Sequence, residues 1–328
     1  MNCFTLSKPA ADFILGIDIG GTNTVFGLVN EAGKIHNKGH LPTEHFLKPE
    51  DLIKSILDVL QSWKKQGLIN TMPQLAGIGA PNAGMPDSII DNPPNLKWKG
   101  KIPFGKLFTE ITGINCVLTN DANASALGEL HYGSRRKIKN FVYVTLGTGL
   151  GCGIVMNGEL VTGINGFAGE LGHTIIMQHG RMCGCGRRGC LEQYCSANGL
   201  VKSYLEILKN SGSEIYQNVI NDPPDAEGIC SRALAGDEAA FYSFKYTGEL
   251  LGLALANSVA YTSPEAVFLA GELSDSGELL MAPLIQSFER NLFHPYKSTV
   301  KLMRASFDAK ESAILGAAAL AKKELIIV

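Results

Sequence analysis

The sequence has no long hydrophobic run and no marked excess of charge of either sign. Its longest apolar stretches, Leu250 to Ala256 and Ala313 to Ala321, are shorter than the roughly 18 residues that a transmembrane helix needs. The formal net charge is −2, which leaves no basic footprint for nucleic acid. The first residues, MNCFTLSKPAADF, lack the basic segment and apolar run of a signal peptide. We therefore expect a cytoplasmic protein that binds neither membrane nor nucleic acid.

Two common nucleotide-binding patterns are also missing. The chain contains neither the GK[ST] end of a Walker A loop nor a GxGxxG fingerprint. It does contain 328 residues, 45% of them apolar, which suits two domains with buried cores. Many of its 37 glycines stand in short runs beside β-branched segments. This distribution favours ligand-binding loops over flexible linkers.

One histidine and three cysteines are clustered between residues 166 and 192. They are His173, Cys183, Cys185 and Cys190. Four thiolate and imidazole ligands make a closed structural zinc site, and clustered cysteines in a reducing cytosol bind metal more often than they form disulfides. Two alternatives stay open: a disulfide with one spare thiol, and a redox pair formed by the first two cysteines. A metal here would also fix the neighbouring carboxylates of Glu170 and Glu192.

A glycine-rich turn joins two apolar segments near the N-terminus. Phe13 to Asp18 and Val25 to Val29 are predicted strands. Between them lie Gly20, Gly21 and Thr22. The turn predicts a tight hairpin whose backbone N–H groups approach a phosphate, because glycine has no side chain in the way. Asp18 at the strand end is placed to hold a water-coordinated Mg²⁺ on that phosphate.

The same pattern recurs in the second half of the sequence. Phe141 to Thr145 and Cys152 to Met156 are predicted strands. The turn between them contains Gly147, Thr148 and Gly149. One such hairpin is weak evidence, because an ordinary turn explains it equally well. Two hairpins at matching places predict a duplicated α/β unit, facing phosphate loops, and a ligand in the cleft between two domains.

An aspartate stands between a predicted strand and an alanine-rich helix. Residues 117–129 read VLTNDANASALGE, so Asn120 or Asp121 is the expected N-cap. The simplest interpretation is that Asp121 only caps the helix. Its place at the carboxyl end of a strand also suits a catalytic base, which the helix N-terminus is expected to keep ionised with a low pKa. Such a base suffices for phosphoryl transfer, in which the hydroxyl loses its proton late.

A loop region rich in asparagine and proline precedes this helix. Residues 77–84 read GIGAPNAG, and residues 91–98 read DNPPNLKW. Asparagine amides beside the indole of Trp98 suit a polyol, because amides offer donors and acceptors to neighbouring hydroxyls. Ordinary turn formation explains the same residues equally well.

Five segments together resemble the ROK family, a group of sugar kinases and sugar-responsive repressors with the actin-like ATPase fold. The segments are DIGGT at 18–22, LTNDANASALGE at 118–129, LGTGLGCGI at 146–154, GELGH at 169–173 and CGCGRRGCLE at 183–192. The last two are the most specific, because chance rarely produces them in tandem.

The resemblance implies an α/β chain with the two-domain actin-like ATPase (ribonuclease H-like) fold, built from duplicated βββαβα units around an inter-domain cleft. The smaller domain would comprise residues 1–119, joined by a C-terminal helix at about 310–328. The larger domain, residues 120–309, would carry the zinc-binding loop. The resemblance also suggests a homodimer.

The resemblance further implies roles for individual residues. The phosphates of ATP and its Mg²⁺ would be bound by Asp18, Gly20, Gly21, Thr22, Gly147, Thr148 and Gly149, with adenosine near Gly271. Asp121 would be the catalytic base. The sugar would contact Asn95, Asn120, Asp121, Glu170, His173 and Glu192. His173 would also bind the structural Zn²⁺, together with Cys183, Cys185 and Cys190.

The expected activity is therefore ATP-dependent phosphorylation of the 6-hydroxyl of a hexose, with glucose favoured over N-acetylglucosamine, N-acetylmannosamine and fructose. A non-enzymatic sugar-sensing regulator and a zinc-stabilised interaction module are the alternatives. Repressors of this family carry an N-terminal winged helix-turn-helix, for which the roughly one dozen residues before the first strand are too few. This favours the kinase.

Three positions depart from the family pattern. Asn82 stands where the turn near residue 80 usually has glycine, and Glu272 follows Gly271 where a second glycine is common. These two changes put the shape of the sugar-facing turn and of the adenosine wall in question. His179 is an extra histidine before the cysteines, and we expect that it does not bind the metal.

Overall fold

The structure is a computed structural model, which describes residues 13–84, 88–93 and 95–326. The chain forms two compact units, Met1–Tyr132 with Ala313–Val328 (unit 1) and Gly133–Ser312 (unit 2). The first division lies after Tyr132 and not after residue 119 as predicted. The reason is that helix α3 (Asp121–Tyr132) packs on the sheet of unit 1, where the side chain of Ala124 approaches Gly79.

Unit 1 contains a five-stranded mixed sheet. Its strands are β1 (Ile14–Ile19), β2 (Asn23–Val29), β3 (Ile35–Pro42), β4 (Leu75–Gly79) and β8 (Asn115–Thr119), in the order β3-β2-β1-β4-β8. The first three strands pair antiparallel, and β4 and β8 continue the sheet parallel to β1. A small second sheet joins β5 (Ala83–Gly84), β6 (Ile89–Asp91) and β7 (Lys101–Ile102).

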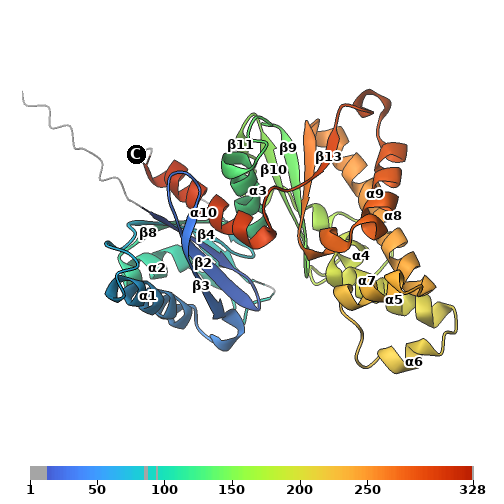
Figure 1. The fold of residues 1–328 in the computed structure, drawn as a ribbon, viewed down its shortest axis with the longest axis horizontal. Coiled ribbons are helices and arrows are strands. Elements are labelled where there is room, and N and C mark those ends of the chain that lie inside the picture. Colours follow the sequence, from blue (N-terminus) through green and yellow to red (C-terminus); the bar gives the residue numbers. More distant parts are fainter. Residues whose placement is uncertain (1–12, 85–87, 94, 327–328) are drawn as a thin grey trace, which may run out of the picture. The chain divides into compact units, whose positions relative to one another are not determined.

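Unit 2 repeats this design. Its strands are β9 (Phe141–Leu146), β10 (Leu150–Met156), β11 (Glu159–Leu160), β12 (Ala266–Ala270) and β13 (Lys301–Arg304), in the order β11-β10-β9-β12-β13 (Figure 1). Again three antiparallel strands are followed by two parallel ones. Both predicted hairpins are present, and the predicted fold class is confirmed.

Two sets of helices cover opposite faces of the unit 1 sheet. Helices α1 (Pro49–Lys65) and α2 (Phe104–Thr112) share a core cluster with Leu15 and Ile17 of β1. Side chains alternate along a strand, so Gly16 between them faces the other side, where it meets α10 (Ala309–Ile326). A Cβ at Gly16 would overlap the backbone of α10. The small residues of α10 therefore serve close packing on the sheet, as residues 313–321 (AILGAAALA) suggest.

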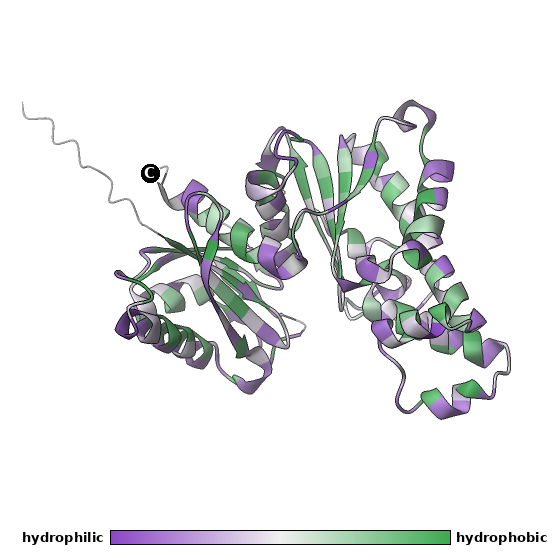
Figure 2. Ribbon diagram, in the orientation of Figure 1, coloured by the Kyte–Doolittle hydropathy of each residue, from purple (hydrophilic) through white to green (hydrophobic). Residues whose placement is uncertain are grey.

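The helices of unit 2 pack on the face of β9 that carries Val142 and Val144. They are α4 (Glu192–Cys195), α5 (Ala197–Asn210), α6 (Ile215–Val219), α7 (Ala226–Leu234), α8 (Glu238–Thr262) and α9 (Glu278–Asn291). Both sheets consist mainly of hydrophobic strands, which agrees with their place in the cores (Figure 2). The four short 3-10 helices are η1 (Thr43–His45), η2 (Leu171–His173), η3 (Glu272–Ser276) and η4 (His294–Tyr296). Of the helices in the described residues, none has the length and apolar character to cross a bilayer.

Candidate functional site

The turn between β1 and β2 is shaped by a side chain far away in the sequence. The N–H of Gly20 donates to the carbonyl of Asn23 at 2.9 Å, which closes the turn. A Cβ placed on Gly21 would lie 2.7 Å from both the Cβ and the carbonyl oxygen of Asn95. Gly21 is therefore glycine because Asn95 packs on it, and the turn and this predicted sugar ligand lie together.

Asp18 and Asp121 lie near each other at the carboxyl ends of the parallel strands of unit 1. The three parallel strands align Asp18 of β1 with Gly79 of β4, and Gly79 with Thr119 of β8. A Cβ on Gly79 would lie 3.5 Å from the Cα of Asp121 and 3.7 Å from Oδ1 of Asp18. Gly79 thus separates the predicted Mg²⁺ ligand from the predicted base. The sequence reasoning assigned it no role, although a glycine at the end of a buried strand is a signal of close approach.

Asn120, and not Asp121, caps helix α3. Its Oδ1 accepts the N–H groups of Ala122 at 2.8 Å and Asn123 at 3.4 Å. Because Asn120 already caps the helix, capping does not explain why Asp121 is present.

The environment of Asp121 shifts its pKa upward. Burial of the carboxyl group raises the pKa, and this effect outweighs the hydrogen bond from the N–H of Ala122 to Oδ1 at 2.8 Å, which lowers it. The low pKa expected from the helix N-terminus is therefore wrong, because desolvation of the charged form exceeds the stabilisation by backbone dipoles. A raised pKa makes the ionised carboxylate a stronger proton acceptor.

The turn between β9 and β10 also packs against a predicted sugar ligand. The N–H of Gly147 donates to the carbonyl of Gly149 at 3.0 Å. A Cβ on Gly149 would lie 2.6 Å from Oε2 of Glu192, which also accepts the N–H of Leu150 at 3.2 Å. By contrast, a Cβ on Gly147 would meet no atom within 4 Å. Each hairpin therefore has one glycine beneath a predicted sugar ligand, and the second hairpin also has one that is open to a ligand.

The predicted metal ligands converge. The ligand atoms of His173, Cys183, Cys185 and Cys190 all lie within 4.8 Å of one another. Nδ1 of the histidine is 3.7 Å from the first of these sulfurs, and the other two sulfurs are 3.6 Å apart. Sulfur ligands of a tetrahedral zinc ion, at about 2.3 Å each, would be separated by about 3.8 Å. The spacing fits structural zinc.

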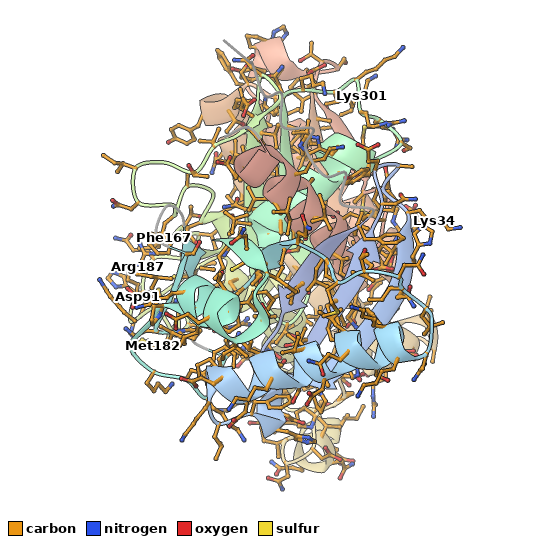
Figure 3. The ribbon with its side chains drawn as sticks, turned by 90° about the vertical axis from the view of Figure 1, so that its left-hand side faces the viewer. Lys34, Asp91, Phe167, Met182, Arg187 and Lys301 are labelled. Carbon is orange, nitrogen blue, oxygen red and sulfur yellow. The ribbon has the colours of Figure 1, made fainter. Side chains whose placement is uncertain are left out.

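The surroundings of the cluster agree with this fit. His179, the extra histidine, is not among the residues that converge, and its backbone has a positive φ of 60°. The cysteines of the described residues are free thiols, and Cys3 lies outside those residues. The neighbouring Met182 and Arg187 are exposed and project outward from the protein (Figure 3). His173 and the three thiols would surround a metal bound here on the side that faces the protein interior.

Two of the thiols have opposite pKa shifts. Burial raises the pKa of Cys185, but hydrogen bonds from the backbone and side chain of Arg187 and from the other two thiols together outweigh it and lower the pKa to about 6. Burial and the hydrogen bond with Cys185 raise the pKa of Cys190 to about 12. Ionisation of Cys185 therefore disfavours ionisation of Cys190. A bound cation would remove this conflict by favouring both thiolates.

The ring of His173 faces two sites. Its Nδ1 points at Cys183, whereas its Nε2 lies 3.9 Å from Oε2 of Glu170. A metal on Nδ1 would leave Nε2 beside Glu170, so the ring can serve both a metal and a sugar. The short helix η2 that carries the ring packs on β10, where a Cβ on Gly172 would overlap the carbonyl of Leu150. The N–H of Leu150 also donates to the carboxylate of Glu192. Strand β10 therefore brings Glu170, His173 and Glu192 close together.

A cavity of about 480 Å³ lies at the end of β12, beside Gly271. Its lining includes Ala270, Glu272, Ser274, Arg304, Phe307 and Lys310. Gly271 has a φ of 95°, and a Cβ there would lie 2.5 Å from the carbonyl oxygen of Leu146. Glycine is therefore required at this position, and the cavity is the candidate for the predicted adenosine site.

Sequence comparison assigns the chain to a family. The ROK family profile matches residues 14–324. The chain belongs to the ROK family. This ROK protein is 32% identical over 315 residues to a glucokinase from Thermotoga maritima, with 95% of this chain and 98% of the relative covered. It is 31% identical over 315 residues to an N-acetylmannosamine kinase from Shigella flexneri, with coverage of 95% and 99%.

Structure comparison agrees. A ROK family glucokinase from Streptomyces griseus, solved in complex with glucose and AMPPNP, superimposes with a TM-score of 0.80 at 29% sequence identity. The match covers 95% of this chain and 99% of the glucokinase. The family and the fold that the sequence suggested are thus confirmed.

The departures of this ROK protein from its family pattern have local explanations. Asn82 adopts a φ of 53°, the left-handed conformation that a glycine there would also allow, and asparagine tolerates it better than most residues. Its side-chain amide donates to the carbonyls of Asp91 at 3.0 Å and Asn92 at 3.3 Å. Glu272 is exposed at the start of η3 and leaves the neighbouring cavity open.

Trp98 does not take part in the site. It is buried in the core of unit 1, with 3% of its surface exposed, and its indole N–H donates to the carbonyl of Phe46 at 3.1 Å. The ring stacks on Phe104 at a centroid distance of 5.8 Å. The suggestion that this indole faces a polyol is therefore wrong, because the sequence distance to Asn95 does not reveal which way the ring points.

Proposed function

We propose that this ROK protein is an ATP-dependent hexokinase that phosphorylates the 6-hydroxyl of glucose. The observation that carries the proposal is the meeting of Asp18 and Asp121 on either side of Gly79. A carboxylate that would hold Mg²⁺ on the phosphates and a base close beside it are what in-line phosphoryl transfer needs. The similarity to kinases along nearly the whole chain supports the same activity.

In the proposed mechanism the protein positions the reactants and moves one proton. The nucleotide phosphates would bind to backbone N–H groups of the turns at residues 20–22 and 147–149 other than those of Gly20 and Gly147, which are used within the turns. Asp18 would hold the Mg²⁺ that accompanies these phosphates. Asp121 orients the 6-hydroxyl and takes its proton as the oxygen bonds to the γ-phosphorus, while the bond to the ADP oxygen breaks. The raised pKa of Asp121 suits this role, because the carboxylate accepts a proton more readily.

Five residues besides Asp121 are proposed to bind the sugar. Asn95 and Asn120 belong to unit 1, and Glu170, His173 and Glu192 belong to unit 2. Amide and carboxylate groups bind the hydroxyls of a hexose and fix its orientation. Zinc, when bound by His173 and the three cysteines, would supply a structural crosslink and no chemical step.

The choice among hexoses follows from the named relatives. Glucose is favoured because the Thermotoga maritima relative and the Streptomyces griseus structure are both glucokinases. N-acetylmannosamine is the nearest alternative, since a kinase for it is almost equally similar. N-acetylglucosamine, fructose and a sugar-sensing regulator without catalysis are the other candidates. The sequence predicts that the protein is cytoplasmic and forms a homodimer.

A coupled assay of ADP release tests the proposal. The protein is incubated with ATP, Mg²⁺ and one sugar at a time: glucose, the two N-acetyl sugars, or fructose. A glucokinase should show its highest kcat/KM for ADP release with glucose. A regulator binds a sugar in calorimetry but releases no sugar-dependent ADP. Asp121→Asn serves as the control, since any remaining ADP release in that variant comes from another source.

A further inference from the structure

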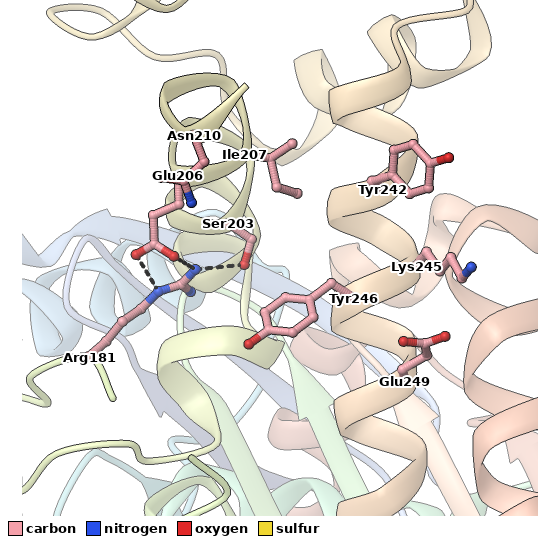
Figure 4. A pocket seen from close by; sticks show the side chains of 9 residues that line it. All are labelled: Arg181, Ser203, Glu206, Ile207, Asn210, Tyr242, Lys245, Tyr246 and Glu249. Carbon is pink, nitrogen blue, oxygen red and sulfur yellow. Dashed lines mark hydrogen bonds and ion pairs between the residues drawn. The ribbon is translucent and has the colours of Figure 1, made fainter. Parts of the chain in front are cut away.

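Arg181 uses every N–H of its guanidinium within the protein. Nε and Nη2 donate to the two carboxylate oxygens of Glu206 at 2.8 and 2.7 Å (Figure 4). Nη2 also donates to the hydroxyl of Ser203 at 3.0 Å, and Nη1 donates to the carbonyls of Gln193 and Gly199. An arginine has five such donors, and all five are engaged. The side chain is only 11% exposed.

These partners lie in helix α4 (Gln193) and helix α5 (Gly199, Ser203 and Glu206), and the two helices meet at Ser196. A further pair of contacts strengthens the connection: the backbone N–H of Arg181 donates to the hydroxyl of Tyr194 at 2.8 Å, and its guanidinium carbon lies 4.4 Å from the centre of the Tyr194 ring. Arg181 stands two residues before Cys183 in the sequence. It therefore joins the start of the metal-binding loop to the α4–α5 junction.

The α4–α5 junction reaches the candidate active site in two places. Helix α4 begins at Glu192, whose carboxylate lies on Gly149 and accepts the N–H of Leu150. The N–H of Ala197, the first residue of α5, donates to the carbonyl of Gly147 at 2.8 Å. A shift of the junction would therefore move the predicted sugar ligand Glu192.

The cavity beside Arg181 does not point to a ligand of its own. It measures about 470 Å³ and is lined also by Glu206, Lys245, Tyr246 and Glu249 (Figure 4). Arg181 would be its obvious anchor for an anion, but the guanidinium has no N–H left to donate. The contacts of Arg181 thus describe a structural connection.

We propose that Arg181 is a positioning residue for sugar binding, which holds the α4–α5 junction so that the carboxylate of Glu192 meets the hexose. The fixed fork of the guanidinium is what the bidentate contact with Glu206 requires, and a lysine cannot reproduce it. This inference rests on the proposed role of Glu192 in binding the sugar.

The test uses the full-length protein with Arg181→Lys and, as a milder change, Glu206→Gln. Replacing a residue that orients a metal ligand typically costs about 10- to 100-fold in affinity or activity. We take the lower end of that range for a residue that orients a sugar ligand and expect Arg181→Lys to raise the KM for glucose about 10-fold. The value of kcat should change less than threefold, and the zinc content should stay at the wild-type level. Hydrogen exchange of the amides of residues 193–200 should become faster. Glu206→Gln should shift the same quantities in the same direction, by less.

Arg188→Lys is the matched control. Arg188 is an exposed arginine of the same loop, and its guanidinium makes one long contact, 3.4 Å, with the carbonyl of Gly180. This variant should keep the wild-type KM and the wild-type exchange.

Three results would decide against the inference. A KM for glucose within twofold of wild type in Arg181→Lys, despite faster exchange of the junction, would overturn it. So would equal losses in Arg181→Lys and Arg188→Lys. Loss of zinc together with the rise in KM would show that Arg181 acts on the metal loop and not on Glu192. If the wild-type protein bound glucose without phosphorylating it, only the kinase proposal would fail. The role of Arg181 would then be tested by the glucose affinity of each variant, measured by calorimetry in place of KM.

Discussion

Gly21 and Gly149 were predicted to be glycine so that a phosphate can approach the backbone. In the structure each has a predicted sugar ligand packed where a Cβ would stand, Asn95 in one case and Glu192 in the other. Sequence alone cannot separate the two reasons, because both require the absence of a side chain. Gly147, with open space around it, retains the original explanation.

The two glycines of the second hairpin therefore make a matched pair. In Gly149→Ala the new methyl group displaces the carboxylate of Glu192, and we expect the KM for the sugar to rise about 10-fold or more, since small displacements of positioning groups have large effects. In Gly147→Ala the methyl group points into open space, and the KM for ATP should rise instead. Steady-state kinetics with each substrate varied in turn measures both. The same effect of both changes on both constants would contradict the assignment.

Asp121 should control the pH dependence of the rate. The base must be ionised to accept a proton, so kcat/KM falls as the pH falls through its pKa. Burial raises that pKa, so the acid limb should lie above the value of about 4 that an exposed aspartate would show. A profile of kcat/KM that stays flat down to this pH would contradict the role.

Replacement of Asp121 gives the complementary measurement. Asp121→Asn keeps the shape of the side chain but cannot accept the proton, so turnover should fall by at least a factor of about 100. Sugar affinity, measured by calorimetry, should stay within an order of magnitude. A variant that retains most of its rate would rule out the proposed mechanism.

At the level of elements, the loop from His173 to Cys190 brings its four predicted metal ligands together. The spacing of these residues in the sequence was sufficient to predict that they converge. The resemblance implied that His173 serves both the metal and the sugar, but it did not say which ring nitrogen faces which partner, because ring orientation depends on how η2 packs on β10.

Cys185→Ser tests the metal brace. Serine is a poor zinc ligand, so the variant should lose most of its bound zinc, as measured by atomic emission. The KM for the sugar should rise or the loop should unfold, while the affinity for ATP at the glycine-rich hairpins should change little. A protein without zinc that kept a normal KM for the sugar would show that the brace is dispensable.

Helix α10 lies in close backbone contact with the strands beneath it. A Cβ at Gly77 would overlap the carbonyl of Ala317, so Gly77→Ala should destabilise the protein by about 1 to 3 kcal/mol through overpacking. Chemical denaturation measures this change. Gly184→Ala is the control, because its methyl group would meet no atom within 4 Å. Equal stability of the two variants would show that the helix can move away at little cost.

At the scale of the whole molecule, the shared strand order of the two units reflects the recurrence of the hairpin sequences. The order β3-β2-β1-β4-β8 corresponds strand for strand to β11-β10-β9-β12-β13. The boundary between the units was less predictable. Helix α3 follows its strand in sequence, and only its packing on the sheet shows to which unit it belongs.

A hexose that binds the folded protein should stabilise it as a whole. At 100 times its Kd, a ligand adds about 2.7 kcal/mol to the free energy of unfolding. Thermal unfolding with each sugar of the panel should therefore rank glucose first, and Asp121→Asn should show the same ranking. If none of the sugars raised the Tm, the assignment of a sugar site would fail.

The sequence by itself determined the chemical inventory of this protein: two glycine-rich hairpins, an aspartate at a helix start, and a set of zinc-type ligands. These features are local, since each depends on neighbouring residues and their spacing. Only the tertiary structure decided that Trp98 is buried, that desolvation raises the pKa of Asp121, and that Arg181 holds helices α4 and α5. These properties depend on burial and on contacts between segments distant in the chain, which a linear pattern does not record.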